Sequence, residues 1–108
     1  MQNITIFCSA SDTVASIYKN EAETVGQWIG THHKTLVYGG ANGGLMEIVA
    51  KEVRDNGSQV LGIITRHIAE MGRSSQQPTD LVTTDSMGER KRLLIEQGDI
   101  LVALPGGI

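Results

Sequence analysis

The fold is decided by residues 36–46, Leu-Val-Tyr-Gly-Gly-Ala-Asn-Gly-Gly-Leu-Met. A short apolar run ends at Gly39 and Gly40, and two more glycines, Gly43 and Gly44, precede a segment with helical spacing of its apolar residues. A strand, a glycine turn and a helix start in this order allow backbone N–H groups to approach an anion at the helix N-terminus. The same order also suits a tight packing turn, and the stretch alone leaves both interpretations open.

Two common phosphate-binding motifs are excluded at this turn. The glycine spacing is not that of G-x-G-x-x-G, and the turn follows the second predicted strand rather than the first. Leu45 and Met46 stand where a P-loop requires Lys followed by Ser or Thr. A dinucleotide oxidoreductase and a P-loop ATPase are therefore disfavoured.

Strand and helix patterns alternate on both sides of the turn. Strands are predicted at residues 4–8, 35–38, 59–64, 81–84 and 99–104, and helices at 12–30, 45–56 and 86–98, with a loop and a short helical turn over 65–79. Ser11 or Asp12 is expected to cap the first helix, and Ser86 with Glu89 has capping-box spacing. Each strand is too apolar to face water, which predicts an α/β fold, a Rossmann-like doubly wound parallel sheet of five strands in one domain, 1–108.

In such a sheet the ligand site lies beyond the carboxyl ends of the strands, where the winding reverses. This rule gathers residues 8–11, 39–44, 84–91 and 105–107 around one crevice. On the outside of the second helix, Glu47 and Lys51 are expected to form an i,i+4 ion pair.

Three consecutive cations, Arg90, Lys91 and Arg92, occupy the first turns of the last predicted helix. The helix dipole favours anions at that end, so a bound phosphate or carboxylate would compensate if Arg90 points into the crevice. The alternative is a solvated face paired with Asp85 and Glu89, and for Arg92 this alternative is preferred.

Composition narrows the function classes. The chain has 108 residues, 40% hydrophobic and 19% charged, with a net charge of −3, which disfavours nucleic-acid and acidic-membrane surfaces. No signal peptide or membrane span is predicted, and the single cysteine, Cys8, suits a reducing compartment, so a cytoplasmic location is expected. Cys8 is interpreted as a small buried hydrophobe, and neither the cysteine count nor the histidine spacing favours a metal site.

Taken together, these segments resemble the LONELY GUY (LOG) family, formerly described as lysine decarboxylase-like. The matching residues are Phe7-Cys8-Ser9, Val37-Tyr38-Gly39-Gly40, Gly44-Leu45-Met46, Met87, Arg90-Lys91 and Leu104-Pro105-Gly106-Gly107. Their order and spacing agree along the whole chain.

The resemblance implies a usually dimeric, cofactor-free hydrolase of the N-glycosidic bond of nucleoside 5′-monophosphates such as AMP. The products would be a free base, in some members a cytokinin, and ribose 5-phosphate. By resemblance, Arg90 is catalytic, Lys91 contacts substrate, Gly106 and Gly107 begin the phosphate loop, and Glu70 falls near a substrate-contacting glutamate.

The first turn, with Gly39, Gly40, Gly43 and Gly44, is then expected nearer the sugar and base, and Ser9 is expected to contact the substrate beside it.

Two departures from the family pattern qualify these expectations. Glu47 stands where the family usually has a glycine after Gly-Leu-Met. The family motif continues Pro-Gly-Gly-x-Gly-Thr-x-x-Glu, whereas this sequence stops at Ile108, so the domain is expected to be cut within the motif and the fragment to be inactive. The other function kept open is a nucleotide- or molybdenum-cofactor-binding carrier without hydrolysis.

Overall fold

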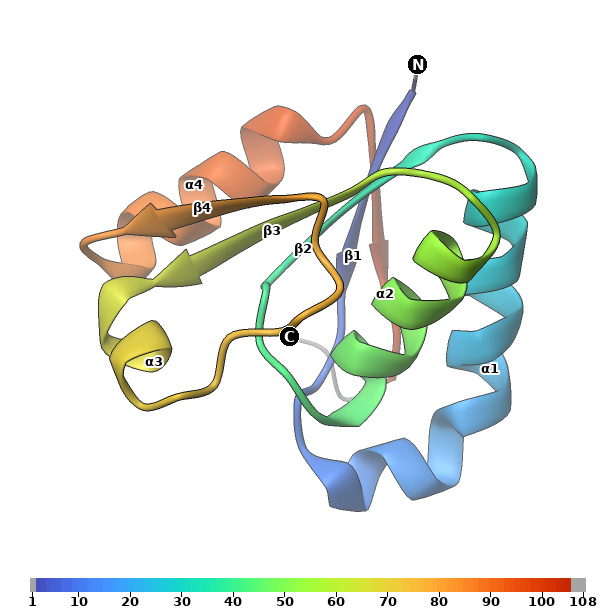
Figure 1. The fold of residues 1–108 in the computed structure, drawn as a ribbon, viewed down its shortest axis with the longest axis horizontal. Coiled ribbons are helices and arrows are strands. Elements are labelled where there is room, and N and C mark those ends of the chain that lie inside the picture. The colour runs from blue at the N-terminus through green and yellow to red at the C-terminus, as the bar shows by residue number, and fades with distance from the viewer. Residues whose placement is uncertain (1, 106–108) are drawn as a thin grey trace.

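The computed structural model describes residues 2–105 and shows strands and helices in alternation (Figure 1). The elements are β1 (Asn3–Phe7), α1 (Asp12–Thr31), β2 (Thr35–Tyr38), α2 (Gly44–Asp55), β3 (Val60–Thr65), α3 (Arg66–Glu70), β4 (Asp80–Thr84), α4 (Met87–Gln97) and β5 (Ile100–Ala103). The short helix α3 lies within the region predicted as a loop with one helical turn, and the other predicted elements are present with ends shifted by a few residues.

The five strands form one parallel sheet in the order β4-β3-β2-β1-β5. In β1, Thr5 pairs with Val37 of β2 on one side and with Leu101 of β5 on the other. The chain therefore winds outward from β1 to β4 and then returns to the opposite side of β1. This arrangement confirms the predicted doubly wound α/β sheet, and it places the reversal between β1 and β5.

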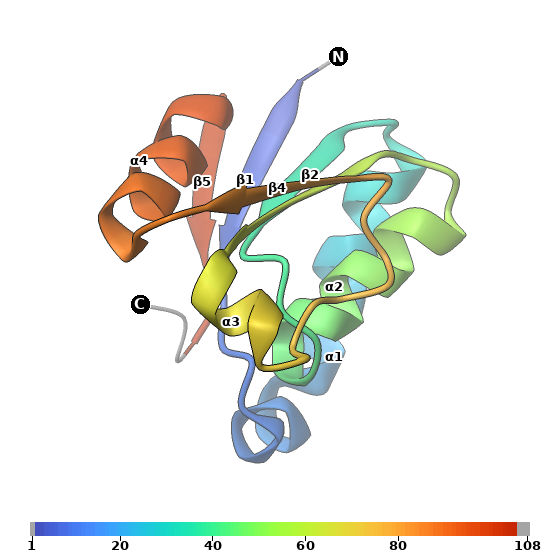
Figure 2. The same ribbon diagram turned by 60° about the vertical axis from the view of Figure 1, so that its left-hand side comes forward.

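Helices cover both faces of the sheet (Figures 1 and 2). α1 and α2 pack on one face, over a core that includes Ile6, Leu36 and Leu45, each at most 1% exposed. α4 packs on the other face, where Leu94 contacts buried side chains of β2 and β3. Since α4 is the crossover into β5, its place on the opposite face follows from the reversed winding.

The prediction that every strand is too apolar to face water is wrong for the two edge strands. In β4, Leu81 and Val82 are 44% and 39% exposed, and in β5, Ile100 and Leu101 are 42% and 48% exposed. Each edge strand has a neighbour on one side only, and the helices lie over the centre of the sheet. A burial pattern read from sequence does not distinguish an edge strand from a central one.

The expected cap of α1 is also different. Ser11 occupies the N-cap position but makes no side-chain cap hydrogen bond. The Asp12 carboxylate instead accepts the backbone N–H of Gly44, at the start of α2, at 3.0 Å. Within residues 2–105 no helix combines the length and apolar character needed to cross a bilayer.

Candidate functional site

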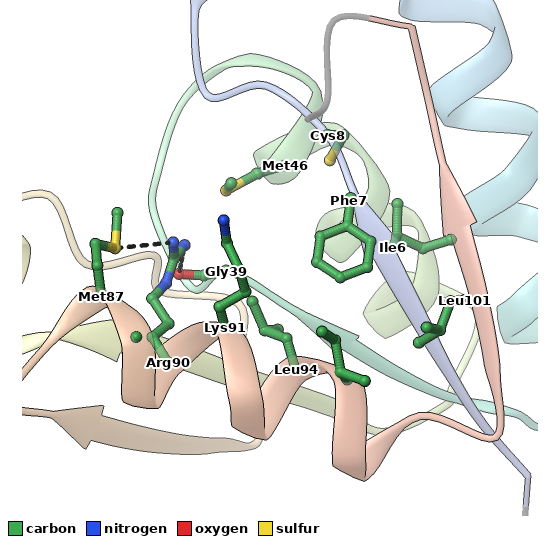
Figure 3. Close-up of a pocket in the computed structure, with 12 residues that line it drawn as sticks. Ile6, Phe7, Cys8, Gly39, Met46, Met87, Arg90, Lys91, Leu94 and Leu101 are labelled. Carbon is green, nitrogen blue, oxygen red and sulfur yellow. Dashed lines mark hydrogen bonds between the residues drawn. The ribbon is translucent and has the colours of Figure 1, made fainter.

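A cavity of about 530 Å³ opens at the carboxyl ends of β1 and β2, beside the first turns of α4 (Figure 3). One end carries Arg90 and Lys91, and an apolar wall comes from β1, α4 and β5. Its lining residues are Ile6, Phe7, Cys8, Gly39, Met46, Met87, Gly88, Arg90, Lys91, Leu94, Ile95 and Leu101. The cavity lies at the winding reversal, where open α/β sheets bind ligands.

Arg90 is the central polar group of this cavity, and carbonyl groups hold it in place. Its Nη2 donates to the Gly39 carbonyl oxygen at 2.8 Å, and its Nε donates to the Ile63 carbonyl oxygen at 2.8 Å. Nη1 lies 3.7 Å from the Met87 sulfur. Figure 3 shows the guanidinium beside Gly39 and Met87, with its hydrogen bonds to them dashed.

The positive charge of Arg90 has no carboxylate partner among the described residues. The ion pairs of residues 2–105 involve Lys19, Lys51, Arg66 and Arg92 as cations. Partial burial lowers the pKa of Arg90 by desolvation, the direction expected for a cation removed from water. An anion in the cavity would offset the cost of that desolvation through its opposite charge and would accept hydrogen bonds from the remaining N–H donors.

The start of α4 explains how Arg90 and Lys91 reach the site. The Ser86 hydroxyl accepts the Glu89 backbone N–H at 3.1 Å, which fixes the first turn as the capping-box spacing predicts. Met87 and Lys91 follow at a four-residue interval on one helix face and line the cavity together. Arg92 lies on the solvated face, as expected, and its Nη1 is 3.0 Å from the Glu96 carboxylate. Its ion-pair partner is therefore Glu96 rather than the expected Asp85 or Glu89.

The glycine turn divides into one cavity residue and three packing residues. Gly39 lines the cavity, whereas Gly40, Gly43 and Gly44 do not, and all three have positive φ values. A Cβ on Gly44 would lie 2.4 Å from the backbone carbon of Ala10. Close approach of the β1–α1 loop therefore demands a glycine there.

Two N–H groups in the first turn of α2 already have acceptors in the β1–α1 loop and the start of α1. The Gly44 N–H donates to Asp12, and the Met46 N–H donates to the Ser9 carbonyl oxygen at 3.2 Å. These contacts supply to the helix end the negative charge and acceptors that a bound phosphate would otherwise supply.

The other expected contact residues lie elsewhere. The Ser9 hydroxyl accepts the Ser11 N–H at 3.0 Å, and Ser9 borders the cavity only through its neighbour Cys8. Glu70 is exposed at the end of α3 and is not among the lining residues. Gly106 and Gly107 lie outside the described residues.

Several lining residues were not singled out from the sequence as site residues. Phe7 and Met46 belong to the segments that carry the family resemblance but were not assigned to the site, and Leu94 and Leu101 lie in stretches interpreted only as a helix and a strand. Because α4 faces the reversal point, the four-residue spacing from Met87 through Lys91 to Ile95 is the signal that could have identified this wall.

Cys8 is a buried residue of the cavity wall, as predicted. It is 3% exposed, and burial raises the pKa of its thiol to about 12. The thiol therefore remains protonated near neutral pH and is a poor nucleophile. Within the described residues, no three His, Cys, Asp or Glu side chains are grouped as a metal centre would need.

Glu47, the departure from the family pattern, has a role that the sequence did not reveal. Its carboxylate accepts the Ser75 hydroxyl at 2.8 Å and the Gln77 side-chain amide at 2.9 Å. The expected pair with Lys51 is absent, because Lys51 instead contacts Asp55 at 2.7 Å.

We call residues 73–77 the strap. Besides the contacts with Glu47, the Ser75 N–H donates to the Gly40 carbonyl oxygen at 2.8 Å, and the Asn42 N–H donates to the Arg73 carbonyl oxygen at 2.8 Å. The strap thus holds the glycine turn and α2 together, and none of its residues lines the cavity.

Comparison with known proteins agrees with this fold. The model of the SLOG cluster4 family matches residues 1–108. The cytokinin riboside 5′-monophosphate phosphoribohydrolase of Rhodococcoides fascians is 35% identical over 108 residues, which is 99% of this chain and 54% of the relative. Cytokinin riboside 5′-monophosphate phosphoribohydrolase LOG2 of Arabidopsis thaliana is 32% identical over 106 residues, which is 98% of this chain and 50% of the relative.

The chain thus spans about half the length of the curated relatives it matches. Among solved structures, the Moco carrier protein from Chlamydomonas reinhardtii gives a TM-score of 0.81 at 21% identity, over 98% of this chain and 65% of that one. This likeness shows the fold. The resemblance to the LONELY GUY family predicted from the sequence is confirmed by the curated relatives.

Proposed function

Because the chain belongs to the SLOG cluster4 family, we propose that it carries the arginine part of a nucleoside 5′-monophosphate phosphoribohydrolase site. The proposed reaction is hydrolysis of the N-glycosidic bond, which releases a free base and ribose 5-phosphate. The observation that carries the proposal is the Arg90 guanidinium, which lines an apolar cavity, is held by two carbonyl groups and has no carboxylate partner among the described residues. Curated relatives with phosphoribohydrolase names support the reaction class.

The cavity suits the two halves of a nucleotide. Phe7, Leu94 and Leu101 offer an apolar wall for a planar base, and Arg90 with Lys91 offers positive charge for the phosphate or the ribose hydroxyls. AMP is the simplest ligand with both parts, and a cytokinin nucleotide adds apolar surface to the base.

Hydrolysis needs a further group. Cleavage of a ribosyl bond develops oxocarbenium character, which a carboxylate stabilises while a water molecule is positioned. No Asp or Glu is among the described residues that line the cavity. We propose that this carboxylate is the glutamate of Gly-Thr-x-x-Glu in the family motif, so that residues 1–108 alone bind nucleotide without turnover.

Binding can be tested by calorimetry of residues 1–108 with AMP and with adenosine. AMP is expected to bind more tightly, and Arg90→Ala to weaken AMP binding by about tenfold or more, since a charge-assisted contact is lost. Arg92→Ala is the matched control, because Arg92 pairs with Glu96 on the solvated face. Equal loss in both variants would show that the arginine site is not the nucleotide site.

Turnover is followed by chromatographic detection of adenine. Residues 1–108 are expected to release none, whereas a chain extended through Gly-Thr-x-x-Glu is expected to do so and to lose the activity on Arg90→Ala. Robust adenine release by residues 1–108 would contradict the assignment of catalysis to that glutamate.

A cytoplasmic homodimer is proposed with this function, on the resemblance to a usually dimeric family. The exposed residue Ile100 on β5, which is not among the residues that line the cavity, supplies apolar surface for further contacts. Sedimentation analysis tests the dimer, and cell fractionation tests the location.

The carrier alternative has weaker support. The Moco carrier likeness, at 21% identity, concerns the fold alone. Calorimetry with a pterin nucleotide beside AMP discriminates the two, because a carrier would prefer the larger ligand.

A further inference from the structure

Gly39 differs from the other three glycines of its turn, because its backbone conformation does not require a glycine. Gly40, Gly43 and Gly44 have φ values of 72°, 85° and 60°, where a side chain is strained. Gly39 is not among the positive-φ glycines, so its backbone could accept any residue without such strain.

Space, rather than backbone conformation, is what excludes a side chain at Gly39. A Cβ placed there would lie 2.1 Å from Arg90 Nη2, 2.8 Å from Met46 Cε and 3.1 Å from Met46 Sδ. Side-chain carbons do not approach other heavy atoms so closely, so the guanidinium or the methyl group would have to move. The Met46 side chain is flexible and can shift, whereas Arg90 is fixed by its two carbonyl acceptors.

We propose that Gly39 is a positioning residue that seats Arg90: its bare α-carbon leaves room for the guanidinium and its carbonyl oxygen accepts Nη2. In this role Gly39 acts through the arginine and need not touch a ligand. An added methyl group would displace the guanidinium from both carbonyl acceptors. The seating stands on geometry alone, and only its consequence for nucleotide binding rests on the proposed function.

The seating is measured directly by the NMR signal of the Arg90 Nε–H, assigned by its disappearance in Arg90→Lys. The bond to the Ile63 carbonyl is expected to give a shifted, slowly exchanging signal in the unaltered chain. Gly39→Ala is expected to return this signal to the position and fast exchange of a solvated arginine. Gly88→Ala is the matched control, because its Cβ would meet only Ser86 Oγ, at 4.0 Å, and the Nε–H signal should stay in place. An unmoved signal in Gly39→Ala would overturn the proposal.

A double-variant test covers the case in which Gly39→Ala folds poorly. With Arg90→Met the guanidinium is absent, so Gly39→Ala is expected to shift the melting temperature much less in that background than in the unaltered chain. Equal shifts in both backgrounds would show that Gly39 is required for packing and not for the arginine.

AMP affinity separates the seating from the function. Gly39→Ala is expected to weaken AMP binding by about tenfold, as the loss of Arg90 does, and to add little more when combined with Arg90→Met. If Gly39→Ala releases the Nε–H signal but leaves AMP affinity unchanged, the proposal that Gly39 seats Arg90 is supported and the proposed nucleotide role of Arg90 is contradicted. A full further loss in the double variant would mean that Gly39 acts on the ligand independently of the arginine.

Discussion

Replacing Glu47 by alanine should release the strap of residues 73–77 from α2. The carboxylate accepts hydrogen bonds from Ser75, which is 7% exposed, and from Gln77, which is partly buried. A hydrogen bond to a charged group contributes about 1.5–3 kcal/mol when well buried, and partial exposure reduces this to about 1 kcal/mol each here. The better helix propensity of alanine returns a few tenths, so the expected loss is about 2 kcal/mol.

The assay is chemical and thermal unfolding followed by circular dichroism. For a domain of this length, about 2 kcal/mol corresponds to a fall in melting temperature of roughly 8–16 °C. The urea m-value should not change, because the unfolded surface is the same. Glu96→Ala is the matched control: it removes an exposed i,i+4 partner of Arg92 and should cost about 0.5 kcal/mol or less.

Local opening gives a second readout. Trypsin cleaves after Arg73, whose guanidinium in the folded strap contacts Asn42 through Nε at 3.2 Å. Glu47→Ala should accelerate cleavage there by about thirtyfold if the whole loss is local. A stability change no larger than that of Glu96→Ala, with unchanged cleavage, would refute the view that Glu47 fastens the strap.

Three further perturbations test other parts of the structure. Cys8 has a folded pKa of about 12 against 9.0 for an unperturbed thiol, so the unfolded chain loses the proton first and stability falls as pH rises above 9. The free energy of unfolding of the unaltered chain should therefore exceed that of Cys8→Ala by about 1 kcal/mol less at about pH 10 than at about pH 8, as measured by denaturant titration. A difference that does not change with pH would contradict the burial of the thiol. Gly44→Ala should cost more than Gly57→Ala, because both have positive φ but only Gly44 would clash with a neighbour, Ala10; equal melting temperatures would contradict this. Thr5→Val should lower stability by about 1–3 kcal/mol through loss of the buried 2.7 Å bond to an α4 carbonyl, and an unchanged urea midpoint would count against that bond.

Local patterns in the sequence were sufficient for the elements and the winding. The alternation of apolar runs with helical spacing predicted the strands, and the Ser86–Glu89 spacing predicted the start of α4. Both depend on residues close together in the chain, where period and capping are decided.

Contacts between distant segments explain what the sequence did not reveal. Asp12 was expected to serve its own helix but caps α2, and Glu47 was expected to pair one turn away but binds the strap. In each case the choice depends on which segments the fold brings together, and a local ion pair of a few tenths of a kcal/mol is easily replaced. Arg90 lines the cavity, as its place in the predicted crevice suggested, yet its carbonyl acceptors, one in β3 and one just after β2, could not be predicted from spacing.

The two hydrogen bonds of Arg90 also depend on the register between β2 and β3. Gly39 and Ile63 directly follow the paired residues Tyr38 and Gly62 of β2 and β3. A slip of one residue between these strands would move one acceptor by about 3.3 Å and turn its carbonyl to the other side, and the guanidinium could no longer bridge both. The arginine can therefore dock fully only after the two strands have aligned correctly. The geometry of the arginine site therefore depends on correct pairing of two neighbouring strands of the sheet.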